Sequence, residues 1–141
     1  MTAETEFEAT NKELVRKSFA AWGYGTGSPY DLLADDAVWT IVGQSAASRT
    51  YHGREDFLAN VIRPFGSRMA SHFIPTIHEM YADGDAVVIL FDAEGTALDG
   101  VAYKNTYAWF LEFAGGKIVK ATAFYDSVLF NEFWKRVLPQ A

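Results

Sequence analysis

The residues with the clearest chemical potential lie in one aromatic stretch, "YKNTYAWF" (103–110), in which Asn105 interrupts an alternation of aromatic residues. Because successive side chains of a strand point to opposite faces, one face would carry Tyr103, Asn105, Tyr107, Trp109 and Leu111. The Asn105 amide and the Tyr107 hydroxyl can both donate a hydrogen bond to a carbonyl or enolate oxygen. Each residue also has a structural alternative. The Asn105 amide could instead be hydrogen-bonded to a neighbouring tyrosine or aspartate. Tyr107 could instead be a core residue whose hydroxyl has a partner within the protein.

A carboxylate with catalytic potential is Asp126, in "AFYDS". Packed against Tyr125, Phe124 and Trp39, this carboxylate would be desolvated, and desolvation raises a carboxyl pKa into a range suited to general base catalysis. Alternatively, Asp126 or Ser127 caps the last helix. Strand parity does not decide between these roles, because a bulge would turn the side chain to the other face.

Further residues are candidates for the wall of an apolar pocket. Trp39 shares the inward parity of Ile41 and either lines the pocket or packs in a plain core. His52 lies in a loop that is either at the pocket mouth, where an imidazole can transfer protons, or simply exposed. The residues expected to contact a ligand are Trp39, Ile41, Phe19, Trp22, His52, Tyr103, Trp109 and Tyr125.

We expect no metal site and no cofactor. The sequence has no cysteine, and His72 and His78 belong to one predicted strand without a second pair at ligand spacing. The glycines of "GYGTG" follow a predicted helix, whereas a dinucleotide-binding loop follows a strand.

Composition limits the class of partner. The chain has 141 residues, a net charge of −6 and 16% aromatic residues. The negative charge argues against nucleic acid and anionic membranes, and the aromatic content favours a pocket for a hydrophobic small molecule. The N-terminus lacks the apolar core of a signal peptide and no apolar run approaches 18 residues, so we expect a cytoplasmic protein.

Helical spacing dominates the first half of the chain. A stripe from Leu14 to Trp22, with Thr10 and Glu13 as a capping box, predicts a helix over 11–22. Ser28 would cap a short helix ending near residue 34, and "AVWTIVG" is a first strand. The stretch 54–65 predicts a helix that Pro64 and Gly66 end.

From Met69 onward the hydrophobic period becomes two. Turn signals at 83–84, 99–100 and 115–116 divide this region into four antiparallel strands, and a helical stripe from Leu129 to Val137, ended by Pro139, closes the chain. These elements predict a single α+β domain over 1–141, with about five strands in a curved antiparallel sheet whose concave face is covered by helices.

The chain resembles the SnoaL-like, ketosteroid-isomerase-related branch of the nuclear transport factor 2-like superfamily. The resemblance covers nearly the whole chain and rests on the order and spacing of "LLADDAVWTIVG", "YHGREDFLANVI", "YADGDAVVILFDAEGT", "YKNTYAWFLEFAGGKIV" and "AFYDSVLFNEF". It implies a conical barrel around one deep pocket, and a homodimer paired through the outer sheet face, where Ala108 and Phe110 would lie. It also implies an acid–base role for Asp126, as in SnoaL-like cyclases.

The resemblance does not extend to the catalytic set of ketosteroid isomerase, which uses an aspartate base and an oxyanion hole of a tyrosine and a protonated aspartate. Ile41, or Thr40 with a one-residue slip, stands at the position of the base. Phe19 stands near the position of the tyrosine, and Asn105 stands at the second aspartate. We therefore do not expect steroid isomerisation by that machinery.

The leading functional hypothesis is a cofactor-free acid–base enzyme of the isomerase, aldol-type cyclase or dehydratase class, acting on a hydrophobic carbonyl compound. Asp126 would move the proton, and Asn105 with Tyr107 would hold the oxyanion. Epoxide hydrolysis ranks lower, because it needs two carboxylates and an arginine around a water. The alternatives are a protein that binds a hydrophobic ligand without turnover, and a pure dimerisation module.

Overall fold

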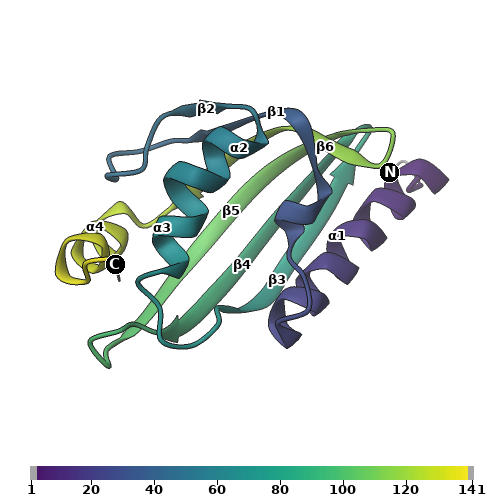
Figure 1. Cartoon of the computed structure of the whole chain (residues 1–141). Coiled ribbons are helices and arrows are strands. Elements are labelled where there is room, and N and C mark those ends of the chain that lie inside the picture. The colour runs from purple at the N-terminus through teal and green to yellow at the C-terminus, as the bar shows by residue number, and fades with distance from the viewer. Residues whose placement is uncertain (1–2, 140–141) are drawn as a thin grey trace.

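Six strands form one curved sheet, in the order β2-β1-β6-β5-β4-β3, in the computed structural model, which describes residues 3–139 (Figure 1). The predicted α+β class is therefore confirmed. The elements are α1 (Glu6–Tyr24), η1 (Pro29–Leu32), β1 (Leu33–Ile41), β2 (Thr50–His52), α2 (Arg54–Phe57), η2 (Leu58–Ile62), α3 (Arg63–Gly66), β3 (Ile74–Asp83), β4 (Ala86–Thr96), β5 (Ala102–Ala114), β6 (Lys117–Tyr125) and α4 (Ser127–Arg136).

The strand pairing differs from the prediction in two respects. β1 and β6 run parallel, whereas the other neighbours in the sheet pair antiparallel as expected. The short strand β2 was not predicted, so the sheet has six strands rather than about five. Both differences have the same origin. Turn signals reveal hairpins between consecutive strands, but the β1–β6 pair is distant in sequence, and the three residues of β2 are too few to show a period.

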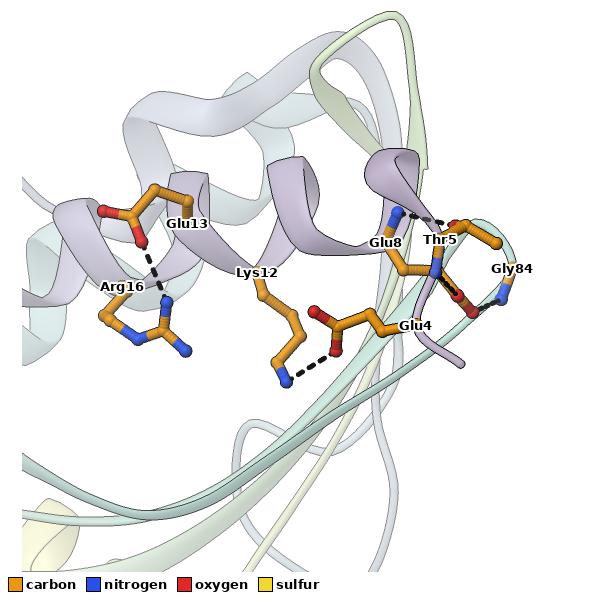
Figure 2. A network of polar contacts seen from close by, with 7 residues as sticks. All are labelled: Glu4, Thr5, Glu8, Lys12, Glu13, Arg16 and Gly84. Atoms are coloured by element: carbon orange, nitrogen blue, oxygen red, sulfur yellow. Dashed lines mark hydrogen bonds and ion pairs between the residues drawn. The ribbon is translucent and has the colours of Figure 1, made fainter. Parts of the chain in front are cut away.

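The first helix begins at Glu6 rather than at residue 11. Its capping box is Thr5 with Glu8: the Thr5 hydroxyl accepts from the Glu8 N–H at 3.1 Å, and the Glu8 carboxylate accepts from the Thr5 N–H at 2.7 Å (Figure 2). Glu8 also accepts from the Gly84 N–H at 2.7 Å, which ties α1 to the turn between β3 and β4. The predicted cap residue Glu13 instead pairs with Arg16. Thr5 with Glu8 and Thr10 with Glu13 both fit the capping-box pattern, but only the first pair also bonds the Gly84 N–H.

The second helical segment, 54–66, runs through Pro64 instead of ending there. The π-helical turn η2 precedes the proline, and the Arg63 N–H donates to Leu58 O. A proline lacks an N–H and its ring crowds the preceding turn, and a widened turn accommodates both effects. Gly66 ends the segment as predicted, and Ser28 caps the short helix η1, which ends at Leu32.

The predicted two faces of β5 are confirmed. Tyr103, Asn105, Tyr107, Trp109 and Leu111 are buried, and the residues between them are mostly exposed. Beside them, Val87, Ile89 and Phe91 of β4 are fully buried. α1 packs on this inner face, with the Phe19 ring edge-on to Phe91 at a centroid distance of 4.8 Å. The inner face of the sheet and the helices therefore share one aromatic core.

The C-terminal helix is held beside α3 by a buried cation. Arg68 is 6% exposed, and its Nε donates to Val137 O at 2.8 Å. Its guanidinium also lies 3.7 Å from the centre of the Trp134 ring. These contacts place α4 at the end of the sheet away from the start of α1 (Figure 1). No helix within residues 3–139 is both long and apolar enough to cross a membrane.

Candidate functional site

A cavity of about 460 Å³ lies between the inner face of the sheet and the helices. Ten aromatic side chains line it: Trp22, Tyr30, Trp39, Phe57, Phe65, Phe73, Tyr107, Trp109, Tyr125 and Phe130. The remaining lining residues are Ile41, Val61, Ile62, Gly66, Met69, Ala70, Ser71, His72 and Ala123. A largely apolar cavity with a few polar groups is the usual form of a small-molecule site.

The structure brings five of the eight predicted contact residues to the cavity wall: Trp22, Trp39, Ile41, Trp109 and Tyr125. Tyr107, predicted as a donor to an oxyanion, lines the cavity as well. Phe19 and Tyr103 lie behind the wall. Phe19 packs on Trp22 and Trp109, and Tyr103 stacks on Phe73 and Phe133. His52 is exposed at the end of β2 and does not line the cavity.

The wall is built from interlocking rings. Trp39 stacks on Phe57 with centroids 4.3 Å apart and meets Trp109 edge-on at 5.0 Å. Trp22, from α1, stacks on the other side of this cluster against Trp109 at 6.1 Å. Rings held by several neighbours keep their orientation, so this part of the cavity is formed before any ligand arrives.

The Asn105 amide is satisfied by its neighbours, which was the alternative left open by the sequence. Its Oδ1 accepts from the backbone N–H groups of Thr106 (2.8 Å) and Asp126 (3.1 Å). Its Nδ2 donates to Asp126 O at 3.0 Å and to the Tyr103 hydroxyl at 2.8 Å. Since backbone N–H groups can only donate and a carbonyl can only accept, these partners fix the orientation of the amide. Asn105 does not line the cavity.

The amide instead directs a hydroxyl into the cavity through two tyrosines. The Tyr103 oxygen accepts from Asn105, so its own proton needs an acceptor, and the Tyr107 oxygen lies 3.2 Å away. Tyr103 is 3% exposed, and no other acceptor for its proton occurs within residues 3–139. Donation from Tyr103 to Tyr107 is the direction that gives the buried Tyr103 proton an acceptor, and in that direction the Tyr107 proton is available to a ligand. We call Asn105, Tyr103 and Tyr107 the tyrosine relay.

Asp126 occupies the N-cap of α4. Its Oδ1 accepts from the backbone N–H groups of Val128 at 2.9 Å and Leu129 at 3.2 Å. The residue is exposed and outside the cavity lining. The expected desolvated carboxylate among aromatic rings is therefore not what the structure shows, because the chain leaves β6 at Tyr125 and turns the next side chain to the helix start.

The part of the cavity wall formed by residues 3–139 carries neutral hydroxyls and no charged carboxylate or amine. Burial raises the pKa of Tyr30 and of Tyr125, and burial together with neighbouring tyrosines raises the pKa of Tyr107 well above its usual value. No Asp, Glu, Lys or Arg occurs among the described lining residues. At neutral pH these tyrosines are hydrogen-bond donors and not bases.

These raised tyrosine pKa values predict a loss of stability at alkaline pH. A pKa raised in the folded state means that deprotonation favours the unfolded chain, so the stabilisation is complete below the ordinary value of 10.0 and is lost as the pH rises above it. We expect the free energy of unfolding to fall above pH 10, by at most about 1.4 kcal/mol per pH unit for each buried tyrosine. Urea unfolding between pH 8 and 11.5 measures this slope. Tyr107→Phe should make it shallower, and equal slopes in the two proteins would contradict the assignment.

Part of the cavity wall was not predictable from the sequence. Tyr30 lies in η1, Phe65 lies in α3, and His72 and Phe73 lie in the irregular segment between α3 and β3. The helix predicted over 54–65 contributes Phe57, Val61 and Ile62, which stand at helical spacing in the sequence. His72 had been placed in a strand, but β3 begins only at Ile74, because no period extends back into this loop.

Comparison with known proteins places the chain in a family. Residues 15–121 match the model of the SnoaL-like domain. No relative among the curated proteins matches.

Three solved structures share the fold. Bal32a, from a soil-derived mobile gene cassette, has a TM-score of 0.75 at 21% identity, covering 92% of this chain and 99% of that one. A protein of Jannaschia sp. CCS1 with the provisional name SnoaL-like polyketide cyclase has a TM-score of 0.72 at 15% identity, covering 91% and 93%. An NTF2-like protein of unknown function from Burkholderia pseudomallei K96243 has a TM-score of 0.69 at 22% identity, covering 84% and 92%.

At these identities the structural neighbours show a shared nuclear transport factor 2-like fold and no shared activity. The family assignment rests on the sequence match, which spans 107 of 141 residues, counted from 15 to 121 inclusive. This chain is a member of the SnoaL-like family.

Proposed function

We propose that this protein binds an uncharged, largely apolar small molecule that carries a carbonyl or a similar oxygen acceptor. The observation that carries the proposal is the cavity of about 460 Å³, lined by ten aromatic side chains and, among the described residues, by no carboxylate, amine or guanidinium. Burying a charged ligand group without an opposite charge is costly, so the cavity favours neutral molecules. Flat rings of the ligand would gain from the aromatic wall.

The acceptor on the ligand would be met by tyrosine hydroxyls. The tyrosine relay leaves the Tyr107 proton without a partner in the described chain, and the Tyr30 hydroxyl likewise has no hydrogen bond within residues 3–139. A hydroxyl that already accepts a hydrogen bond is polarised and donates more strongly. The Tyr125 hydroxyl lies 2.8 Å from the Ser45 hydroxyl, and donation from Tyr125 to Ser45 would use its proton within the protein, so that Tyr125 contributes less to the ligand.

The second candidate function is turnover by acid–base chemistry of the isomerase, aldol-type cyclase or dehydratase class. The same Tyr107 hydroxyl favours it, because a donor aimed at a carbonyl also stabilises an enolate. The provisional name of the Jannaschia neighbour, a polyketide cyclase, agrees with this class. Asp126 is poorly placed as its base, since its Oδ1 already accepts from two backbone N–H groups of α4.

Binding is tested with prodan, an uncharged fluorescent naphthyl ketone whose emission moves to the blue in apolar surroundings. We expect saturable binding with a blue shift, and weaker binding of the anionic 6-(dimethylamino)naphthalene-2-carboxylate. Ala70→Trp should abolish binding, because Ala70 is an exposed lining residue and a large ring there would block the cavity. Ala59→Trp is the matched control, since Ala59 is exposed and outside the lining. Unsaturable binding, or equal effects of the two tryptophans, would contradict the proposal.

We also propose that the protein is a homodimer paired through the outer face of the sheet. Strand register aligns Leu90, Ala108 and Phe124 in one row and places Phe110 in the next. Leu90, Phe110 and Phe124 are 39%, 44% and 48% exposed. A contiguous apolar face of this kind is typical of an interface and can pair with its own copy about a two-fold axis.

The dimer is tested by sedimentation at micromolar concentration. Phe110→Glu should convert the dimer to a monomer, because the interface would place two like charges near its axis. Val101→Glu is the control, since Val101 is similarly exposed, at 48%, but lies in the turn before β5. A monomeric natural protein would contradict the proposal.

A further inference from the structure

We infer that His72 is the general base of this pocket, taking a proton from a carbon acid bound in the cavity. The inference rests on the ligand pocket proposed above and adds to it the residue that would move the proton. It replaces Asp126, which the sequence had suggested for that role.

The cavity wall offers few side chains that can exchange a proton. Among the described lining residues, the side chains that can gain or lose a proton are Tyr30, Tyr107, Tyr125 and His72. The three tyrosines hold their protons at neutral pH, because removal from water raises their pKa values. An imidazole is the side chain whose ordinary chemistry includes accepting a proton near neutral pH. His72 is therefore the lining group with the chemistry of a base.

A backbone contact fixes the tautomer of the His72 imidazole. The His72 Nε2 lies 3.0 Å from the carbonyl oxygen of Gly23, in the last turn of α1. A carbonyl oxygen can only accept, so Nε2 carries a hydrogen and donates it. In the neutral ring, Nδ1 then holds the lone pair, and it has no hydrogen-bond partner within residues 3–139. A second group that fixes tautomer and orientation is the usual support of a catalytic histidine.

The loop that carries His72 lies next to the tyrosine relay. The residue after His72, Phe73, packs its ring edge-on against the Tyr107 ring at a centroid distance of 6.2 Å. His72 is exposed and Tyr107 is buried, and both line the cavity, so His72 borders it from the solvent side and the end of the tyrosine relay from the inner face of the sheet. A ligand that fills this space can meet the imidazole and the Tyr107 hydroxyl together.

The reaction supported by this pair is a proton shift next to a carbonyl. Nδ1 takes a proton from the carbon beside the carbonyl, and the electron pair of that C–H bond moves to form an enolate whose oxygen accepts from the Tyr107 hydroxyl. The imidazolium keeps its Nε2 hydrogen bond to Gly23 O and returns the proton to another carbon of the enolate system. The product is an isomer of the substrate, and no other reactant is consumed.

The inference is tested with 5-nitrobenzisoxazole, a small neutral carbon acid. Removal of its ring C–H proton by a base breaks the N–O bond and forms a nitrile and a coloured phenolate, so each proton transfer is counted directly. We expect turnover above the buffer rate. His72→Gln should lower kcat by roughly 10²-fold with KM little changed, which is the lower end of the range for general bases.

Two controls separate a base from a structural residue. Glutamine can keep a donor to Gly23 O, so His72→Gln preserves the contact and removes the base; added imidazole should restore turnover in His72→Ala. Asp126→Asn should leave turnover unchanged, because asparagine is nearly as good an N-cap. Probe binding with turnover that survives His72→Gln, or with no turnover above buffer, would overturn the assignment and leave the ligand pocket standing. Absence of any probe or prodan binding would overturn both.

Discussion

Replacing Asn105 with leucine is expected to destabilise the protein by about 2–4 kcal/mol, because the buried Tyr103 hydroxyl and partly buried backbone groups each lose a partner, at up to about 1–3 kcal/mol for a buried group. The amide makes four hydrogen bonds and is 2% exposed. A leucine would leave the N–H and C=O of Asp126 unpaired at the junction of β6 and α4. Urea unfolding monitored by tryptophan fluorescence measures the change.

Two further variants make the Asn105 prediction specific. Asn105→Asp keeps an oxygen for the two backbone N–H groups but sets a second oxygen against Asp126 O and buries a carboxylate at a site that is 2% exposed, so it should also be destabilised, and less so at acid pH, where a protonated carboxyl can donate to Asp126 O. Glu112→Gln, on the exposed face of the same strand, should change the free energy of unfolding by less than about 0.5 kcal/mol. A leucine variant as stable as the glutamine control would show that the amide network contributes little.

Replacing Trp109 with alanine is expected to cost about 3–5 kcal/mol, the usual range for removing a large buried aromatic residue. Trp109 is 3% exposed and contacts the rings of Phe19, Trp22, Tyr30, Trp39 and Phe91. Its loss removes a central member of the cavity wall. The same variant should therefore weaken prodan binding as well as lower the melting temperature.

A graded series tests this explanation. Trp109→Phe should cost less than Trp109→Ala, because it leaves a smaller void. Tyr24→Ala is the control, since Tyr24 is 83% exposed and should change stability by less than about 0.5 kcal/mol. If Trp109→Ala unfolded at the same urea concentration as the natural protein, the wall could not be the rigid cluster described here.

Strand parity was a sound guide to the cavity but could not identify its polar partners. The alternation in β5 predicted the inward face of Tyr107 and Trp109, and the parity of β1 did the same for Trp39. Parity says which face a side chain occupies, and nothing about what lies opposite. The partner that satisfies Asn105 is the peptide of Asp126, which is 21 residues away in sequence and comes close through the β5–β6 pairing.

The segments whose hydrophobic residues follow no helical or strand repeat were the least predictable. Asp126 is a helix cap because the backbone turns directly after β6, and the sequence allowed that role without requiring it. His72 reaches the cavity from the loop between α3 and β3. Loops obey no repeating pattern, so the position of their side chains follows from tertiary packing that a single sequence does not display.

The central claim is that the tyrosine relay presents the Tyr107 hydroxyl to the carbonyl of a neutral ligand, and the infrared carbonyl stretch of bound prodan tests it most directly. In the natural protein we predict a stretch at lower frequency than in a hydrocarbon solvent, because a hydrogen bond weakens the C=O bond. Tyr107→Phe should move the carbonyl stretch back toward its hydrocarbon value. Tyr125→Phe should leave the stretch largely unchanged, because the Tyr125 hydroxyl of the natural protein is hydrogen-bonded to Ser45. An identical carbonyl frequency in the natural protein and in Tyr107→Phe, with prodan bound to both, would contradict the claim.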